Sequence, residues 1–145
     1  MRYLQITETN DIYNALLSFS ECFPHLKEKV TSLYVFAEKL AYKAEVYIGL
    51  SEDKPIGITC FYANDYKTRC GYITLIGVKS NCRKKGIGKD LLCFSIKKMQ
   101  EKGMQTVKLE VDKDNHTAIG FYQHMGFQTL SEIESGFYLI KEIVE

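Results

Sequence analysis

The spacing of apolar residues divides the chain into a helical N-terminal third and a remainder rich in strands. The segment YLQI predicts a short first strand. Apolar residues at helical spacing then predict helices over residues 12–21 and 24–42, with Asp11 as the cap of the first. The two helices are separated at Phe23-Pro24, because the residue before a proline avoids helical angles.

Strand patterns begin near residue 45. EVYIGL and PIGITCFYA, joined by the turn SEDK, predict a hairpin, and CGYITLIGV predicts a third strand whose apolar run suggests burial on both faces. QTVKLEV, FQTL and GFYLIKEIV predict three more strands, with helices over 86–102 and 115–125. The order β-α-α-β-β-β-α-β-α-β-β favours a single α/β domain over residues 1–145, built on a mixed sheet.

Composition narrows the classes of protein that fit this pattern. The formal net charge is +1, which provides no overall attraction to nucleic acid or to a membrane surface. Five cysteines form no CxxC pair, so we expect no metal site. Their odd number, in a chain long enough for a full-sized core, indicates free thiols in a reducing compartment. The N-terminus has no apolar signal-peptide core and no apolar run is long enough to span a bilayer. We therefore expect a cytoplasmic protein.

The stretch CRKKGIGKD, residues 82–90, carries the clearest chemical signal in the sequence. It places a basic turn and Gly86-x-Gly88 between a strand and a helix. A helix start exposes unpaired N–H groups and partial positive charge, and glycines let phosphate oxygens reach the backbone. Further positive charge comes from Arg83, Lys84, Lys85 and Lys89. The stretch predicts a phosphate-binding loop, although a tight turn with solvated lysines is the alternative.

Two other phosphate-binding motifs fit this loop poorly. A P-loop needs a hydroxyl residue after Gly-Lys to hold magnesium, but Asp90 follows Lys89. A Rossmann fingerprint needs a third small residue, but Leu91 stands at that place. A nucleotide-binding protein is therefore the weaker interpretation.

At this point the chain resembles the GCN5-related N-acetyltransferase (GNAT) family. RKKGIG is similar to the Arg-x-x-Gly-x-Gly acyl-CoA loop of that family, and LEVDKDNHTAIGFYQHMGF is similar to its second signature. The resemblance covers residues 44–128 well and residues 1–43 by pattern alone. It implies a GNAT-like fold and an N-acetyltransferase that uses acetyl-CoA as co-substrate. A primary amine would attack the acetyl thioester directly while both substrates are bound in a ternary complex.

The resemblance also implies roles for individual residues in binding acetyl-CoA. The pyrophosphate would bind to the loop opened by Arg83 and formed by the backbone of Lys84, Lys85, Gly86, Ile87, Gly88 and Lys89. The pantetheine arm would lie in a V-shaped slot between the strands at 70–79 and 105–111. Its amides would pair with the backbone of Gly77, Val78 and Lys79, and Asn115 would contact the same arm. The Val78 N–H would polarise the thioester carbonyl.

Two residues are candidates for the proton transfers. Tyr122, which the resemblance places near the sulfur, could protonate the departing thiolate, since a phenol has a pKa of about 10 and a thiol about 8.5. Core packing is its alternative role. Many family members carry a glutamate at the place of Tyr72 or Thr74, so the usual base is missing here. Glu110 resembles the base of the branch that acetylates protein N-termini; a structural ion pair, or a water chain in place of a base, is the alternative.

A second interpretation comes from a different class of protein. The chain could be a CoA-binding sensor or partner module without catalysis, because no carboxylate stands at Tyr72 or Thr74. As an enzyme it would act on a small-molecule or peptide amine, which the sequence does not identify. A homodimer could form through the edge of the terminal strands.

Overall fold

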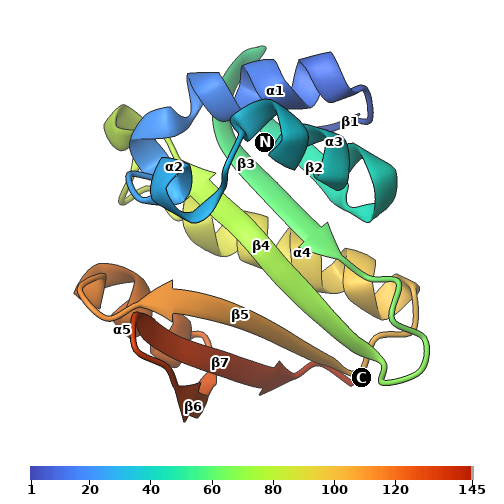
Figure 1. Ribbon diagram of the computed structural model, residues 1–145, viewed down its shortest axis with the longest axis vertical. Coiled ribbons are helices and arrows are strands. Elements are labelled where there is room, and N and C mark those ends of the chain that lie inside the picture. The colour runs from blue at the N-terminus through green and yellow to red at the C-terminus, as the bar shows by residue number, and fades with distance from the viewer. Residues whose placement is uncertain (145) are drawn as a thin grey trace.

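The computed structural model describes residues 1–144, which form a mixed sheet of seven strands in the order β1-β2-β3-β4-β5-β7-β6 (Figure 1). The strands are β1 (Arg2–Ile6), β2 (Glu45–Ser51), β3 (Lys54–Tyr62), β4 (Cys70–Val78), β5 (Thr106–Asp112), β6 (Gln128–Glu132) and β7 (Gly136–Glu142). The helices are α1 (Thr9–Ser18), α2 (Leu26–Lys29), α3 (Leu33–Lys43), α4 (Ile87–Glu101) and α5 (His116–His124), with 3-10 turns η1 (Ser20–Cys22) and η2 (Ser80–Cys82). The predicted number and order of strands are confirmed.

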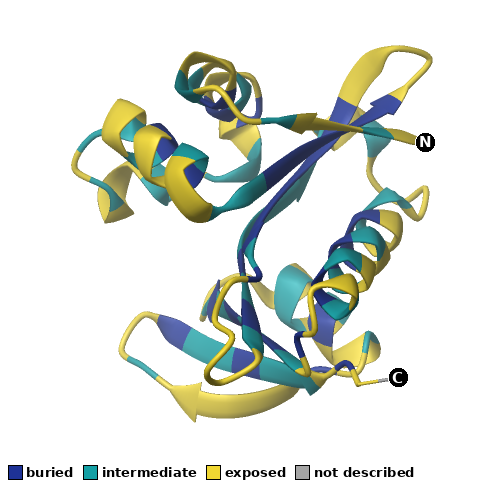
Figure 2. Ribbon diagram, turned by 90° about the vertical axis from the view of Figure 1, so that its right-hand side faces the viewer, coloured by how far each residue is buried: buried dark blue, intermediate teal, exposed yellow. Residues whose placement is uncertain are grey.

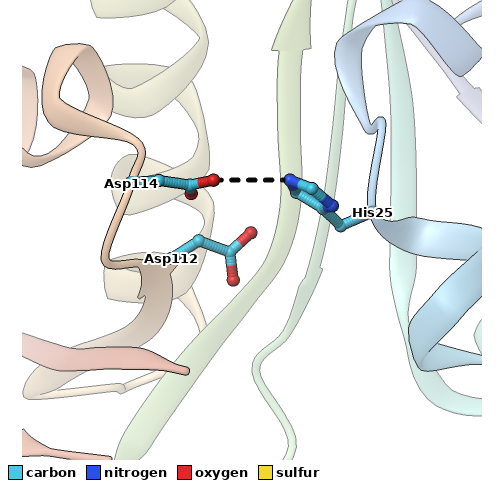
Figure 3. Close-up of side chains that lie close together, drawn as sticks. All are labelled: His25, Asp112 and Asp114. Atoms are coloured by element: carbon cyan, nitrogen blue, oxygen red, sulfur yellow. Dashed lines mark ion pairs between the residues drawn. The ribbon is translucent and has the colours of Figure 1, made fainter. Parts of the chain in front are cut away.

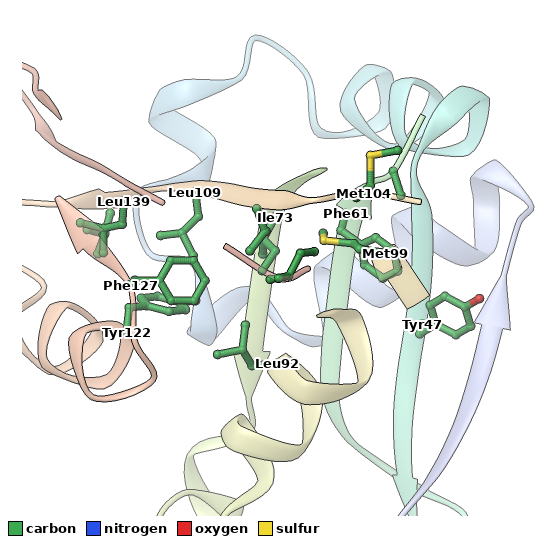
Figure 4. Close-up of a cluster of buried hydrophobic side chains, with 14 residues drawn as sticks. Tyr47, Phe61, Ile73, Leu92, Met99, Met104, Leu109, Tyr122, Phe127 and Leu139 are labelled. Atoms are coloured by element: carbon green, nitrogen blue, oxygen red, sulfur yellow. The ribbon is translucent and has the colours of Figure 1, made fainter. Parts of the chain in front are cut away.

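The sheet separates two apolar cores, one on each face. Val46 and Ile48 of β2 pack with α1 and α3, while Tyr47 between them belongs to the core on the other face. This alternation is the period of a β-strand. The second core joins α4, α5 and the strands β5 and β7, and Figure 4 shows Tyr122 and Leu92 among its side chains. Each helix therefore covers one defined face of the sheet.

The helix expected over residues 24–42 is wrong in one respect, because the chain leaves the helix at residues 30–32. Val30 and Ser32 have extended backbone angles, and the Ser32 Oγ accepts a hydrogen bond from the Val35 N–H at 3.3 Å. Ser32 thus starts α3 as a new helix. The expected cap at Asp11 is also wrong, since α1 begins two residues earlier and Asp11 lies in its first turn.

The expectation that β4 is buried on both faces is wrong as well. Only Gly71 and Ile73 of this strand are buried, and residues 74–78 are half-buried. The reason is the pairing with β5, which runs from Cys70↔Thr106 to Ile73↔Leu109 and then stops. The second half of β4 therefore has β3 on one side and no paired strand on the other.

Burial is uneven across the sheet (Figure 2). The central strands carry most of the buried residues, whereas every residue of β6 is exposed. Strand β6 is one edge of the sheet and β1 is the other. No helix within residues 1–144 combines the length and the apolar character needed to cross a membrane.

A glycine holds β5 and β7 together at the end of their ladder. A Cβ on Gly136 would collide with the backbone carbonyl of Val111, so we expect Gly136→Ala to destabilise the protein by about 1–3 kcal/mol or more. Gly120→Ala is the matched control, since Gly120 lies in α5 with open space around it and alanine favours a helix by up to about 1 kcal/mol. Urea unfolding measures both, and equal stabilities of the two variants would contradict the tight contact.

Candidate active site

The strands β4 and β5 start as paired parallel neighbours and then diverge toward their carboxyl ends (Figure 1). The ladder between β3 and β4 shifts at the same place, with Cys60 opposite Leu75 and Phe61 opposite Ile73. Thr74 is therefore an extra residue in β4, and such a bulge bends and twists its strand. We call residues 74–78, on the side turned toward β5, the open edge of β4.

One backbone hydrogen bond shows which groups the open edge presents. The Lys79 N–H donates to the Ile56 carbonyl at 2.9 Å, which belongs to the pairing of β4 with β3. Backbone groups of an antiparallel strand point alternately toward and away from its partner, so the polar groups of Val78 point to the open edge. The Lys79 N–H is already used. Gly77, Val78 and Lys79 were expected to pair with the pantetheine arm. Of these three, Val78 is the residue whose N–H points away from β3 and toward the open edge.

The side chain of Arg83 anchors the basic loop to the same place. Its Nε donates to the Val78 carbonyl at 3.1 Å, and the Cys22 Sγ donates to that carbonyl at 3.3 Å. The Val78 carbonyl thus already accepts hydrogen bonds from two side chains of the protein, while the Val78 N–H remains available to bind another molecule. Arg83 therefore positions the loop in addition to lending it positive charge.

The start of α4 has the geometry of an anion-binding helix end. Gly86 is the N-cap with φ 78° and ψ 8°, a left-handed conformation, and no side chain caps the helix. Lys84 also has a positive φ of 67°. The first N–H groups of α4, from Ile87 to Lys89, are consequently not bonded to a capping side chain, and the dipole of the fifteen-residue helix adds partial positive charge.

The helix start and the open edge meet at Gly88. A Cβ placed on Gly88 would lie 3.8 Å from Phe121 Cζ and 4.0 Å from Val78 Cγ2. Three elements predicted to bind the cofactor from separate parts of the sequence, namely the loop, β4 and α5, therefore come together. Asn115 begins α5 as predicted, with its Oδ1 accepting from the Ala118 N–H at 3.2 Å, which leaves the side-chain amide free to donate.

Tyr122 lies on α5 and is 7% exposed. Its ring packs edge-on against Phe121 and Phe127, with centroids 5.2 and 5.4 Å away. Burial raises the pKa of Tyr122, so its hydroxyl stays protonated at neutral pH. The residue packs in the core and also keeps a proton that it can donate.

Glu110 lies on the opposite face of the sheet from Tyr122. Leu109 and Val111 belong to the core that holds Tyr122, so Glu110 between them points the other way. Its Oε2 is 3.5 Å from the Lys29 Nζ of α2, which is the structural ion pair given above as the alternative role of Glu110. The sequence did not identify Lys29 as the partner. Burial, followed by the charge of Glu110, raises the pKa of Tyr72 to about 12. A neutral tyrosine hydroxyl therefore stands at Tyr72, one of the two positions, with Thr74, at which the resemblance would place the usual glutamate.

A group of ionisable side chains lies at the end of β5. Figure 3 shows His25, from the segment before α2, facing Asp112 and Asp114, and the His25 Nε2 is 3.7 Å from Asp114 Oδ2. One ligand atom of each of these three residues lies within 4.8 Å of the others. The Lys29 Nζ is 2.7 Å from Asp112 Oδ1 and supplies a counter-charge. The absence of a metal stays a prediction.

Comparison with known proteins assigns this fold and site to a family. Residues 9–127 match the Acetyltransferase (GNAT) family, and the chain belongs to that family. A mycothiol acetyltransferase of Paenarthrobacter aurescens is 39% identical over 57 residues, which cover 39% of this chain and 18% of that protein. N-alpha-acetyltransferase 30 of Schizosaccharomyces pombe is 30% identical over 83 residues, which cover 56% of this chain and 55% of that protein.

The fold is also similar to that of a solved N-acetyltransferase. The PaiA N-acetyltransferase of Thermoplasma acidophilum, solved in complex with coenzyme A, superposes with a TM-score of 0.75 at 19% identity, over 98% of this chain and 99% of that one. The predicted GNAT-like fold is confirmed. The chain spans 18% and 55% of the length of these two curated relatives. Their activities therefore support a proposal about this chain and do not establish its activity.

The buried hydroxyl of Tyr122 predicts a pH dependence of stability. Because burial raises its pKa above the ordinary value of about 10, unfolding releases a proton above that pH, and stability falls as the pH rises. Tyr122→Phe keeps the ring, so its stability should decline less steeply, by up to about 1.4 kcal/mol per pH unit. Urea unfolding between about pH 9 and pH 11 measures the slopes.

The control for that experiment is Tyr42→Phe, since Tyr42 is 80% exposed. It should reproduce the wild-type slope. A Tyr122→Phe slope that equals the slopes of the wild type and of this control would show that the hydroxyl ionises freely in the folded protein.

Proposed function

We propose that the protein is an N-acetyltransferase that moves an acetyl group from acetyl-CoA to a primary amine by direct attack in a ternary complex. One observation carries the proposal: the uncapped start of α4, with Gly86 and Gly88, lies beside the open edge of β4. A helix end suited to a diphosphate and a strand edge suited to amides are what an acyl-CoA needs side by side. Membership of the GNAT family supports it.

The residues at this site fit acetyl-CoA, which when bound supplies an acetyl thioester as the acyl donor. The first N–H groups of α4 would bind the pyrophosphate, with charge from Lys84, Lys85 and Lys89. The Val78 N–H would donate to the thioester carbonyl and stabilise negative charge that develops there. The free side-chain amide of Asn115 would donate to the pantetheine arm. Gly77 and Lys79 would shape this edge through their pairing with β3.

The two proton transfers would take place on opposite faces of the sheet. Glu110 would accept a proton from the amine on the face that α2 covers, and Tyr122 would donate its hydroxyl proton to the leaving sulfur from the other face. The absence of a paired strand next to residues 74–78 would give both groups access to the reacting atoms. The raised pKa of Tyr122 keeps its hydroxyl protonated at neutral pH, so the proton is present when the thiolate forms, but it also makes this hydroxyl a weaker acid.

The acceptor that we favour is an α-amine. The name of the fission-yeast relative describes an N-alpha-acetyltransferase. An α-amine has a pKa of about 7.7–8.0 and a lysine amine about 10.4, so a carboxylate removes a proton from an α-amine more readily. A cytoplasmic location and a homodimer formed through β6 stay predictions.

A catalytically inactive CoA-binding module is the second candidate. It is favoured by the engagement of Glu110 with Lys29 and by the lack of a carboxylate at Tyr72 and Thr74. A module of this kind would bind CoA through the same loop and strand. It would release no thiol from acetyl-CoA when amines are added.

The proposal is tested by combining a binding measurement with a thiol-release assay. We expect acetyl-CoA and CoA to bind with sub-millimolar affinity in calorimetry, and Mg-ATP to bind more weakly. We also expect free thiol to appear when acetyl-CoA is mixed with a panel of α-amines. Binding without thiol release on any amine would favour the module, and no CoA binding would end the proposal.

The role of Tyr122 can be separated from its packing. Tyr122→Phe should lower kcat by about a hundredfold, the lower end of the range for general acid catalysis, because the hydroxyl alone is removed. The dissociation constant of acetyl-CoA should stay close to that of the wild type. Tyr42→Phe, at an exposed site, is the control with unchanged turnover. Equal turnover of the wild type and Tyr122→Phe would exclude the hydroxyl as the acid.

A further inference from the structure

The segment between α1 and α3 reaches across the diverging strands and contacts the carboxyl ends of both. On the β4 side, the Glu21 Oε1 accepts from the Ser80 N–H at 3.3 Å, and the Cys22 Sγ bonds to the Val78 carbonyl. On the β5 side, Lys29 and His25 contact the acidic residues that end the strand. An amine that approaches Glu110 on this face therefore meets this segment first.

Lys29 is the residue of that segment that contacts the proposed base. Its ammonium bridges two carboxylates, 2.7 Å from Asp112 Oδ1 and 3.5 Å from Glu110 Oε2. Partial burial lowers the pKa of Lys29, but the hydrogen bond and charge of Asp112, together with the charge of Glu110, outweigh it and raise the pKa. The side chain is therefore a protonated amine at neutral pH.

That ammonium has the same chemistry as the acceptor. An α-amine or a lysine amine arrives mostly protonated at neutral pH or below, and must come within reach of a base. We propose that Lys29 occupies the binding site of the acceptor's ammonium in the free protein, on Glu110 and Asp112. The acceptor displaces Lys29, and Asp112 then holds the incoming ammonium beside Glu110. This inference rests on the proposed function and makes Lys29 and Asp112 determinants of acceptor affinity.

The exchange is energetically accessible. The side chain of Lys29 is 44% exposed, and those of Glu110 and Asp112 are 26% and 22% exposed, so the pair lies at the surface. Exposed ion pairs of this kind are weak, and a competing ammonium can replace one. The contacts of Glu21 and Cys22 with the end of β4 would hold the segment while the Lys29 side chain swings into solvent.

The test uses alaninamide as the probe, because it carries an α-ammonium and no carboxylate. It is titrated near pH 6, below the α-amine pKa of about 7.7–8.0, into protein with ¹³C-labelled lysines that is saturated with CoA. The Lys29 signal, assigned with Lys29→Gln, should shift with alaninamide and should not shift with neutral N-acetylalaninamide. Tetramethylammonium, which has charge but no N–H, measures general screening and should have little effect.

The variants quantify the competition. Lys29→Gln should bind alaninamide about two- to fivefold tighter than the wild type, the range expected when an exposed ion pair is removed. Asp112→Asn should bind it more weakly. Lys27→Gln is the matched control, two residues earlier in α2, and should bind like the wild type. In turnover, Lys29→Gln should lower the KM for the amine more than it changes kcat.

The outcomes separate this inference from the proposed function. Suppose that CoA binds and amines are acetylated, but Lys29→Gln has the same affinity for alaninamide and the same KM as Lys27→Gln. The proposed displacement of Lys29 is then wrong, while the proposed acetyltransferase activity is supported. If alaninamide does not bind, or binds without moving the Lys29 signal, the exchange is also overturned. Failure of CoA to bind removes the proposed function itself, and the exchange with it.

Discussion

The early end of the ladder between β4 and β5 is the constraint on which the site depends. Four residue pairs hold the strands together, from Cys70 with Thr106 to Ile73 with Leu109, and beyond them the strands share no backbone bonds. The bulge at Thr74 lies at this point and turns the second half of β4. Backbone groups that a continuous sheet would use internally, above all the Val78 N–H, are thereby left for another molecule.

The rest of the site is arranged around that opening. The loop before α4 lies next to it, because Arg83 bonds to the Val78 carbonyl and Gly88 lies near Phe121 and Val78. The acidic residues of β5 and the buried hydroxyl of Tyr122 lie on opposite faces of the sheet. An acyl donor held between the strands would thus meet a carboxylate from one side and a protonated phenol from the other.

Local patterns were sufficient to predict the strands and the loop. Alternating apolar residues marked the hairpin and β5, and Gly86-x-Gly88 marked a helix start without a capping side chain. The break before α3 could not be predicted in this way, because Leu26, Val30 and Leu33 keep helical spacing across it. The spacing of apolar residues indicates which face of a segment is apolar, but it does not show whether each backbone hydrogen bond of a helix is formed.

Contacts between distant parts of the chain could not be predicted from the sequence for a different reason. The open edge of β4 depends on where its register with β5 stops, which the apolar run of CGYITLIGV does not encode. The pairing of Lys29 with Asp112 joins residues 83 positions apart, and neither residue is unusual in its own segment. The shared face of Glu110 and Asp112 could be predicted from strand alternation, but the cation that meets them could not.

Amide hydrogen exchange, measured with and without CoA, tests the central claim most directly. The account predicts that CoA slows exchange at Val78 and at the first amides of α4, from Ile87 to Lys89. Exchange at Lys79, whose N–H already bonds to Ile56, should change little. If CoA binds but the amides of Val78 and of the start of α4 exchange as fast as in the free protein, the claim is contradicted that the diverging strands β4 and β5 and this helix end form one site.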